Sequence, residues 1–197
     1  MLILAADTSL PILSVAIVRE GEMLGAAAVE GRSSRNEKLL PAIDWLLAET
    51  ATDRRSIDIF AVTRGPGSFT GVRIGLATMQ GMALALGKPV CAMSTHEAIA
   101  PPRGKRIIVD DAGRGEFYVS VFDNGVEVKA PRLARSLEDL DGERLVVGEF
   151  VQGGNVALSC ARRAAQIVGA GRLAEYSDIT PIYVRLAEAE EKLRRAP

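Results

Sequence analysis

The chain has 197 residues, which is enough for one medium domain or two small lobes around a buried core. Hydrophobic residues make up 48% and charged residues 25%, and the formal net charge is −1. This balance argues against disorder and against strong unaided binding of nucleic acid.

The first half of the chain predicts a β-meander followed by alternating helices and strands. Short apolar runs predict strands over residues 2–6, 12–19 and 23–30. Helical spacing of leucine and isoleucine then predicts a helix over 34–50, with Ser33 or Ser34 as its N-cap.

The same half continues with a strand, a glycine-rich loop and a second helix. We expect the strand over 57–62 and the helix over 71–86, followed by a strand at 88–93 and a short helix at 95–100. The 71–86 helix is apolar on nearly every side, whereas a surface helix usually keeps a polar face. It therefore needs two apolar neighbours: its own sheet and, we expect, a second protein chain.

Two prolines and a glycine at 101–104 mark the predicted boundary between an N-terminal lobe, 1–100, and a smaller C-terminal lobe, 101–197. In the second lobe we expect a strand from 106, a hairpin of 116–122 and 126–129 around Asn124-Gly125, and a strand at 145–147. Helices are predicted at 137–140 and 156–168, and the charged tail 186–195 has a helical pattern. The second strand-turn-strand opening hints at an internal duplication.

Two polar turns are candidates for a nucleotide clamp. Asp7, Thr8 and Ser9 stand between the first two strands, and Asp110 and Arg114 occupy the equivalent strand end in the second lobe. The alternative is that both are simply polar hairpin turns. The loop at 65–68 lacks the Gly-Lys-Ser/Thr of a P-loop, and Thr70 stands where a dinucleotide motif has its last glycine. Its glycines therefore predict a tight turn and close helix packing, with Ser68 or Thr70 as helix cap.

The sequence offers no catalytic constellation. His96 is the only histidine, which excludes a two-histidine metal site, and a G-x-S-x-G nucleophile motif is missing. Cys91 and Cys160 predict two reduced core thiols. A signal peptide is not visible, and the 71–86 helix is too short to span a bilayer, so we expect a cytoplasmic protein without membrane contact.

Several segments together resemble the TsaB (YeaZ) family of bacterial proteins, which help to install threonylcarbamoyladenosine in tRNA. They are ILAADTS, NEKLLPAIDWLL, VTRGPGSFTGVRIGLATMQGMALALGKPV, DDAGRGEFYVSVF and PIYVR, and they cover nearly the whole chain. The resemblance implies an α/β, two-lobe, actin-like (ASKHA, ribonuclease-H-like) fold with mixed sheets and a shortened second lobe. Many members carry a histidine early in the first helix, where this chain has Arg35-Asn36-Glu37-Lys38.

The resemblance also implies a non-catalytic scaffold that binds and stabilises the catalytic paralogue TsaD together with the ATPase TsaE. In the family, two helices from each partner form a four-helix bundle, and homodimers use the same surface. The corresponding interface residues here are Asn36, Leu39, Leu40, Ile43, Trp45, Thr70, Gly71, Arg73, Ile74, Gly75, Thr78, Met79 and Met82.

We expect no cofactor in the isolated chain, because the turn at Asp7 lacks the glycine of the actin-like phosphate loop. ATP and a divalent metal would enter only through partner subunits, and tRNA only within the complex. The alternative function is an ATP-dependent small-molecule kinase or carbamoyl transferase that uses Asp7 and Asp110 around Mg²⁺. A protease is disfavoured because a nucleophile–base pair is missing.

Overall fold

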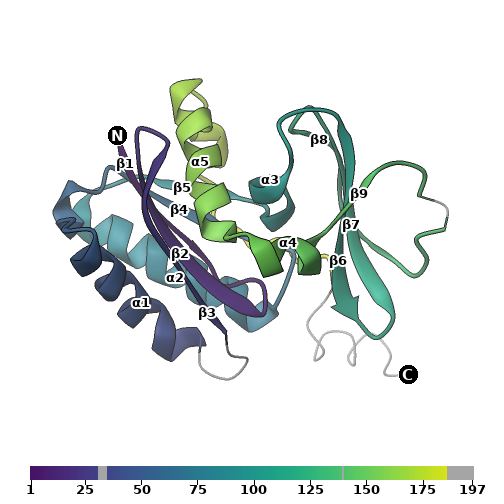
Figure 1. Cartoon of the computed structure of the whole chain (residues 1–197), viewed down its shortest axis with the longest axis horizontal. Coiled ribbons are helices and arrows are strands. Elements are labelled where there is room, and N and C mark those ends of the chain that lie inside the picture. Colours follow the sequence, from purple (N-terminus) through teal and green to yellow (C-terminus); the bar gives the residue numbers. More distant parts are fainter. Residues whose placement is uncertain (31–34, 139, 186–197) are drawn as a thin grey trace.

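The computed structural model describes residues 1–30, 35–138 and 140–185 of the chain. The predicted N-cap at Ser33 or Ser34 and the predicted helix in the tail 186–195 lie outside the described residues. Two mixed sheets organise the molecule, one on each side of Figure 1, with helices on both faces of the first. This arrangement confirms the predicted α/β class.

The first sheet has five strands in the order β3-β2-β1-β4-β5. They are β1 (Leu2–Asp7), β2 (Ile12–Arg19), β3 (Glu22–Glu30), β4 (Ile59–Thr63) and β5 (Val90–Met93). The first three pair antiparallel, as the predicted meander requires, and β4 and β5 then add in parallel beside β1.

Side chains alternate between the two faces of this sheet and build a core on each. On one face, α1 (Arg35–Glu49) and α2 (Phe69–Leu86) cover Leu4, Val15 and Phe60. On the other, α3 (Thr95–Ile99) and α5 (Val156–Gly169) cover Ile3, Val18 and Ala61. Figure 1 shows α5 crossing the first sheet although it comes late in the chain.

The second sheet has the order β8-β7-β6-β9. It consists of β6 (Lys105–Gly113), β7 (Glu116–Asp123), β8 (Val126–Ala134) and β9 (Arg144–Val146). Its antiparallel meander with a parallel strand beside the first repeats the β3-β2-β1-β4 arrangement, and so strengthens the hint of an internal duplication. The short helix α4 (Val147–Gly153) follows and supplies Val147 to the apolar cluster beneath this sheet.

Two local expectations need correction. At the predicted helix 137–140, the Leu140 amide donates to the Leu137 carbonyl at 3.1 Å, which closes only a turn. The Arg144 guanidinium donates to the carbonyls of both Leu137 and Leu140. Those carbonyls are therefore capped by a side chain and do not start a helical ladder. Helix α4 was not expected from the sequence, because two of its seven residues are glycine, which is a poor helix former.

Candidate functional site

The predicted partner face lies on α2, whose two ends are firmly capped. The Ser68 hydroxyl accepts a hydrogen bond from the Gly71 amide at 3.2 Å, which confirms one of the two predicted caps. At the other end Gly87 adopts the left-handed conformation, with φ of 63°, that favours glycine at a helix C-terminus. The helix therefore presents a fixed surface.

Five of the predicted interface residues pack inside the chain. Leu39, Ile43 and Met79 have no exposed surface, and Gly71 and Gly75 are also buried. The expectation is corrected for these residues: they support the helices from within, because the first sheet lies directly beneath them. Ile74, Thr78 and Met82 are partly buried, whereas Leu40, Thr70 and Arg73 are exposed.

The outward face of α2 also includes residues outside the expected interface set. Ala77, Gln80, Gly81 and Leu84 are exposed, and Leu84 keeps 81% of its surface in solvent. Val72, Leu76, Met79 and Ala83 form the buried face of α2, so the positions opposite them point outward. Because the helix is apolar on nearly every side, its sequence pattern did not distinguish these two faces.

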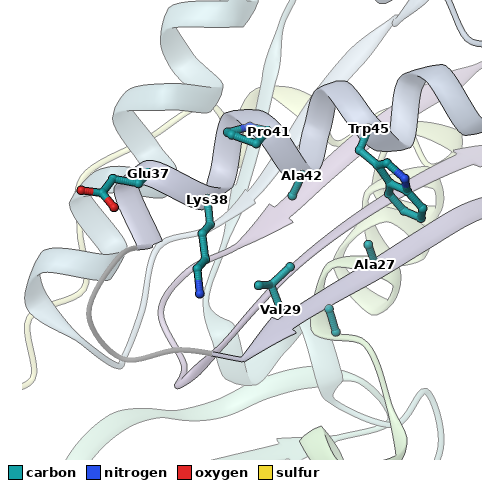
Figure 2. Close-up of a pocket in the computed structure, with 8 residues that line it drawn as sticks. Ala27, Val29, Glu37, Lys38, Pro41, Ala42 and Trp45 are labelled. Atoms are coloured by element: carbon teal, nitrogen blue, oxygen red, sulfur yellow. The ribbon is translucent and has the colours of Figure 1, made fainter.

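Helix α1 presents its exposed residues on two different flanks. Trp45, which is 54% exposed, lies beside β3 and lines a groove there, as Figure 2 shows. Leu40 is 47% exposed and does not line that groove. Asn36 lies in the first turn of α1, and its side chain is outside the described part of the chain. Trp45 and Leu40 would therefore contact different parts of a bound protein.

The groove between α1 and β3 has a volume of about 580 Å³. Small apolar residues of β3 and α1 form most of its lining, and Glu37 and Lys38 stand at one end (Figure 2). The Lys38 ammonium donates to the Glu30 carbonyl at 3.4 Å across this end. The groove thus continues the surface of α1 away from α2.

A buried polar cluster surrounds Asp7 at the end of β1. Its Oδ1 accepts hydrogen bonds from the hydroxyls of Ser9, at 2.6 Å, and Thr63, while the Ser9 and Thr95 hydroxyls are 2.9 Å apart. The other carboxylate oxygen, Oδ2, is buried without a partner in the described chain. Burial raises the pKa of Asp7 above its ordinary value, and the hydroxyl bonds counteract only part of that effect.

The loop before α2 closes over this turn. The Ser68 amide donates to the Ser9 carbonyl at 2.7 Å, and the Thr8 hydroxyl donates to the Gly71 carbonyl at 2.6 Å. A Cβ at Gly67 would lie 2.4 Å from the Ser9 carbonyl oxygen, and one at Gly75 2.4 Å from Thr8 Oγ1. These contacts confirm the predicted role of the glycines in a tight turn and close helix packing.

This closure bears on whether a nucleotide phosphate fits at the turn. The hydroxyls of Thr8, Ser9 and Thr63 already have partners within the chain. Those three hydroxyls are therefore not free to donate to a phosphate. Among the described residues no group of three or more histidine, cysteine or acidic side chains could hold a metal ion.

The second predicted turn lies at the end of β6. Asp110 is partly buried, and its pKa rises to about 7, first through burial and then through the charges of Asp111 and Asp7. Asp7 and Asp110 therefore lie within electrostatic range of each other. Arg114 occupies the β6–β7 turn, with a backbone φ of 62°.

The other titratable residues considered above, His96, Cys91 and Cys160, are all buried. The His96 Nδ1 lies 2.6 Å from the Ser120 hydroxyl, joining α3 to β7, and burial lowers the histidine pKa to about 3. Cys91 and Cys160 are both buried free thiols. Within the described ranges, none of the helices has the length and apolar run needed to cross a membrane.

Comparison with protein families gives one match that covers more than half of the chain. Residues 32–142 match the family model of TsaD, described as tRNA N6-adenosine threonylcarbamoyltransferase. The matched region includes α1, α2 and most of the second sheet.

Individual relatives extend the similarity to nearly the full length. The chain is 28% identical to the tRNA threonylcarbamoyladenosine biosynthesis protein TsaB of Escherichia coli, covering 98% of both chains. It is also 28% identical to TsaB of Bacillus subtilis, covering 98% of this chain and 97% of that one. Among solved structures, YeaZ from Pseudomonas aeruginosa is 26% identical with a TM-score of 0.71, covering 92% of this chain and 99% of that chain.

Proposed function

Because this chain belongs to the TsaB (YeaZ) branch of the family that the threonylcarbamoyltransferase model describes, we propose that it is a non-catalytic subunit in the synthesis of threonylcarbamoyladenosine in tRNA. Its relatives from Escherichia coli and Bacillus subtilis carry the name of that biosynthesis. In this proposal the chain binds and stabilises a TsaD-like catalytic paralogue in the cytoplasm.

The observation that carries the proposal is the outward face of α2. Thr70, Ala77, Gln80 and Gly81 are small or uncharged, and Leu84 is almost fully exposed. In the eighteen residues of this helix Arg73 is the single charged side chain. Such a face suits helix-on-helix packing, in which small residues allow close backbone approach and a leucine fills the partner's groove.

The remaining partners follow from the same assignment. We infer that a TsaE-like ATPase joins the pair, that tRNA is bound only by the assembled complex, and that the isolated chain forms a homodimer through the same face. We also infer that ATP and the divalent metal are held by partner subunits. The internal hydrogen bonds of the Asp7 turn support this part, since they occupy its hydroxyl donors.

The test is Leu84→Asp, measured against the TsaD-like protein of the same organism by calorimetry or analytical ultracentrifugation. We expect the affinity to fall about 100-fold or more, because a carboxylate would be buried unpaired at the interface. The thermal unfolding midpoint of the variant alone should not change, since Leu84 is 81% exposed.

The matched control is Val126→Asp, which adds the same charge at an apolar side chain that is 62% exposed on β8. It should bind like the unmodified chain. Met79→Asp is unsuitable, because Met79 is completely buried and the variant would unfold. If Leu84→Asp binds as tightly as Val126→Asp, the α2 face is not the interface.

A further inference from the structure

Arg73 is exposed, yet its side chain is held in one position by two aromatic rings. Its Nε donates to the Tyr183 hydroxyl at 2.7 Å, and its guanidinium carbon lies 3.8 Å from the centroid of the Phe69 ring. The Phe69 and Tyr183 rings are themselves 4.8 Å apart. Cation–π contact and a directed hydrogen bond therefore fix both the place and the plane of the guanidinium.

Tyr183 can hold Arg73 because the segment around it is anchored on both sides. Before it, the Ile182 amide donates to the Arg64 carbonyl at 2.7 Å, and Arg64 forms an ion pair with Asp178 at 3.1 Å. After it, Arg185 donates to the Ala112 carbonyl at 2.8 Å in the second sheet. The C-terminal segment is therefore held in a fixed position beside the start of α2.

The terminal nitrogens of Arg73 remain available. In the part of the chain that the structure describes, its one hydrogen bond uses Nε, so the two outer nitrogens have no partner. Those two nitrogens form a fork that matches the two oxygens of a carboxylate. The Arg73 side chain is already ordered in the free protein, so a ligand that binds its two outer nitrogens causes little further loss of side-chain entropy.

We propose that Arg73, positioned by Phe69 and Tyr183, is the specificity-determining contact of the α2 face and binds an aspartate or glutamate side chain of the docked protein partner. This inference rests on the proposed function and names the chemistry that the partner must present. A carboxylate misplaced by one helical turn would leave Arg73 buried and unpaired, so this contact sets the register of docking.

An RNA phosphate fits the surroundings of Arg73 less well. The nearby arginines Arg64 and Arg185 are already in ion pairs, with Asp178 and Glu116. A single phosphate contact adds little affinity, because nucleic-acid binding builds on several neighbouring cations. The uncharged helix around Arg73 instead suits burial against a protein, where one paired charge discriminates strongly.

The experiment measures the dissociation constant of the full chain and its TsaD-like partner, at two salt concentrations, for three single variants and one double variant. We expect Arg73→Met to weaken binding about 30-fold or more and to reduce its salt dependence. Arg73→Lys should remain about 10-fold weaker than the unmodified chain, because an ammonium group cannot form two parallel bonds. Tyr183→Phe should weaken binding about 3–10-fold in the otherwise unmodified chain. Added to Arg73→Met, it should weaken binding no further.

Two controls isolate the effect. Arg135→Met removes the same charge from an 89% exposed arginine directly after β8 and should leave binding unchanged. In the free chain, the Arg73 Nε–H signal in ¹⁵N NMR should be protected from exchange, and Tyr183→Phe should abolish that protection.

The outcomes separate the two proposals. If the unmodified chain binds but Arg73→Met binds equally well, the carboxylate contact is wrong while the scaffold function stands. If Arg73→Met keeps the partner but weakens binding of tRNA to the complex, the fork takes a phosphate and the proposal is overturned. If neither the unmodified chain nor Arg135→Met binds the partner, the proposed function fails and this inference fails with it.

Discussion

At the scale of single residues, the contact between Thr8 and Gly75 shows how closely α2 approaches the first sheet. A Cβ at Gly75 would lie 2.4 Å from Thr8 Oγ1, which already donates to the Gly71 carbonyl. Gly81, one and a half turns further along the same helix, has no atom within 4 Å of an added Cβ. One helix therefore contains both a glycine that packing requires and one that it does not.

We predict that Gly75→Ala lowers the free energy of unfolding by about 2 kcal/mol, because Thr8 must move and lose its hydrogen bond. Gly81→Ala should instead raise it by about 0.5–1 kcal/mol, since alanine is the better helix former. Urea denaturation of both variants measures the difference. A gain of the same size in both variants would show that helix propensity, and not the Thr8 contact, decides the effect.

A second residue-scale prediction concerns Asp110, whose pKa rises to about 7 in the folded chain from an ordinary value of 3.8. Between these values the folded state holds a proton that the unfolded state has lost. The stability of the fold should therefore decrease as pH rises from about 4 to about 7 and then level off. Asp7, whose pKa is also raised by burial, adds to the same trend.

The variant that checks this is Asp110→Asn, followed by urea denaturation from pH 4 to pH 8. It should flatten the pH dependence and make the chain about 1–2 kcal/mol more stable at pH 8, because the buried charge is gone. Asp141→Asn removes an exposed carboxylate and serves as control. If the stability of Asp110→Asn depends on pH as strongly as that of Asp141→Asn, other groups cause the trend.

At the scale of elements, Arg185 joins the described C-terminal segment to the second sheet. This side chain contacts the carbonyls of Ala112 and Gly113 and forms an ion pair with Glu116, and it is only 16% exposed. Arg135 forms an ion pair with the same Glu116 at 3.1 Å but is 89% exposed. The two arginines thus share one partner in two very different environments.

We therefore predict that Arg185→Ala lowers the unfolding midpoint by about 3–6 °C, because it leaves the Ala112 and Gly113 carbonyls without this donor and removes the less exposed of the two arginines that pair with Glu116. Arg135→Ala should leave the midpoint nearly unchanged, as expected for an exposed ion pair. Differential scanning calorimetry of the two variants tests this, and equal midpoints would mean that the segment is held elsewhere.

At the scale of the whole molecule, α5 joins the two halves of the chain. It follows the second sheet in sequence, yet it packs Ala157, Cys160 and Ala164 against the first sheet. Without it, apolar residues of β1, β2 and β4 on that face would be open to water. The predicted division into residues 1–100 and 101–197 stays a prediction, and this contact gives a way to examine it.

Residues 1–100 expressed alone should not fold cooperatively, because one face of the sheet loses its cover. Joining them through a flexible linker to residues 154–177 should restore a cooperative transition, and a scrambled version of that segment should not. Circular dichroism during thermal unfolding distinguishes the three. Cooperative folding of 1–100 alone would show that α5 is dispensable for the first lobe.

The sequence by itself determined the elements that depend on local pattern. Short apolar runs and helical patterns located β1, β2, α2 and α5 to within two or three residues, and Ser68 was one of the two predicted caps of α2. The glycines of the loop before α2 were correctly assigned to packing, because their spacing failed the phosphate-binding motifs. Such features depend on neighbours a few residues away in the chain, which the sequence contains.

Only the tertiary structure decided which way each helix faces and which distant groups meet. An α2 that is apolar all round has too little contrast for its outward side to be read from sequence, so Met79 was expected at the surface and Leu84 was missed. The contact of Tyr183 with Arg73 joins residues 110 positions apart. Such contacts depend on how the sheets and helices pack, and local sequence patterns do not specify that packing.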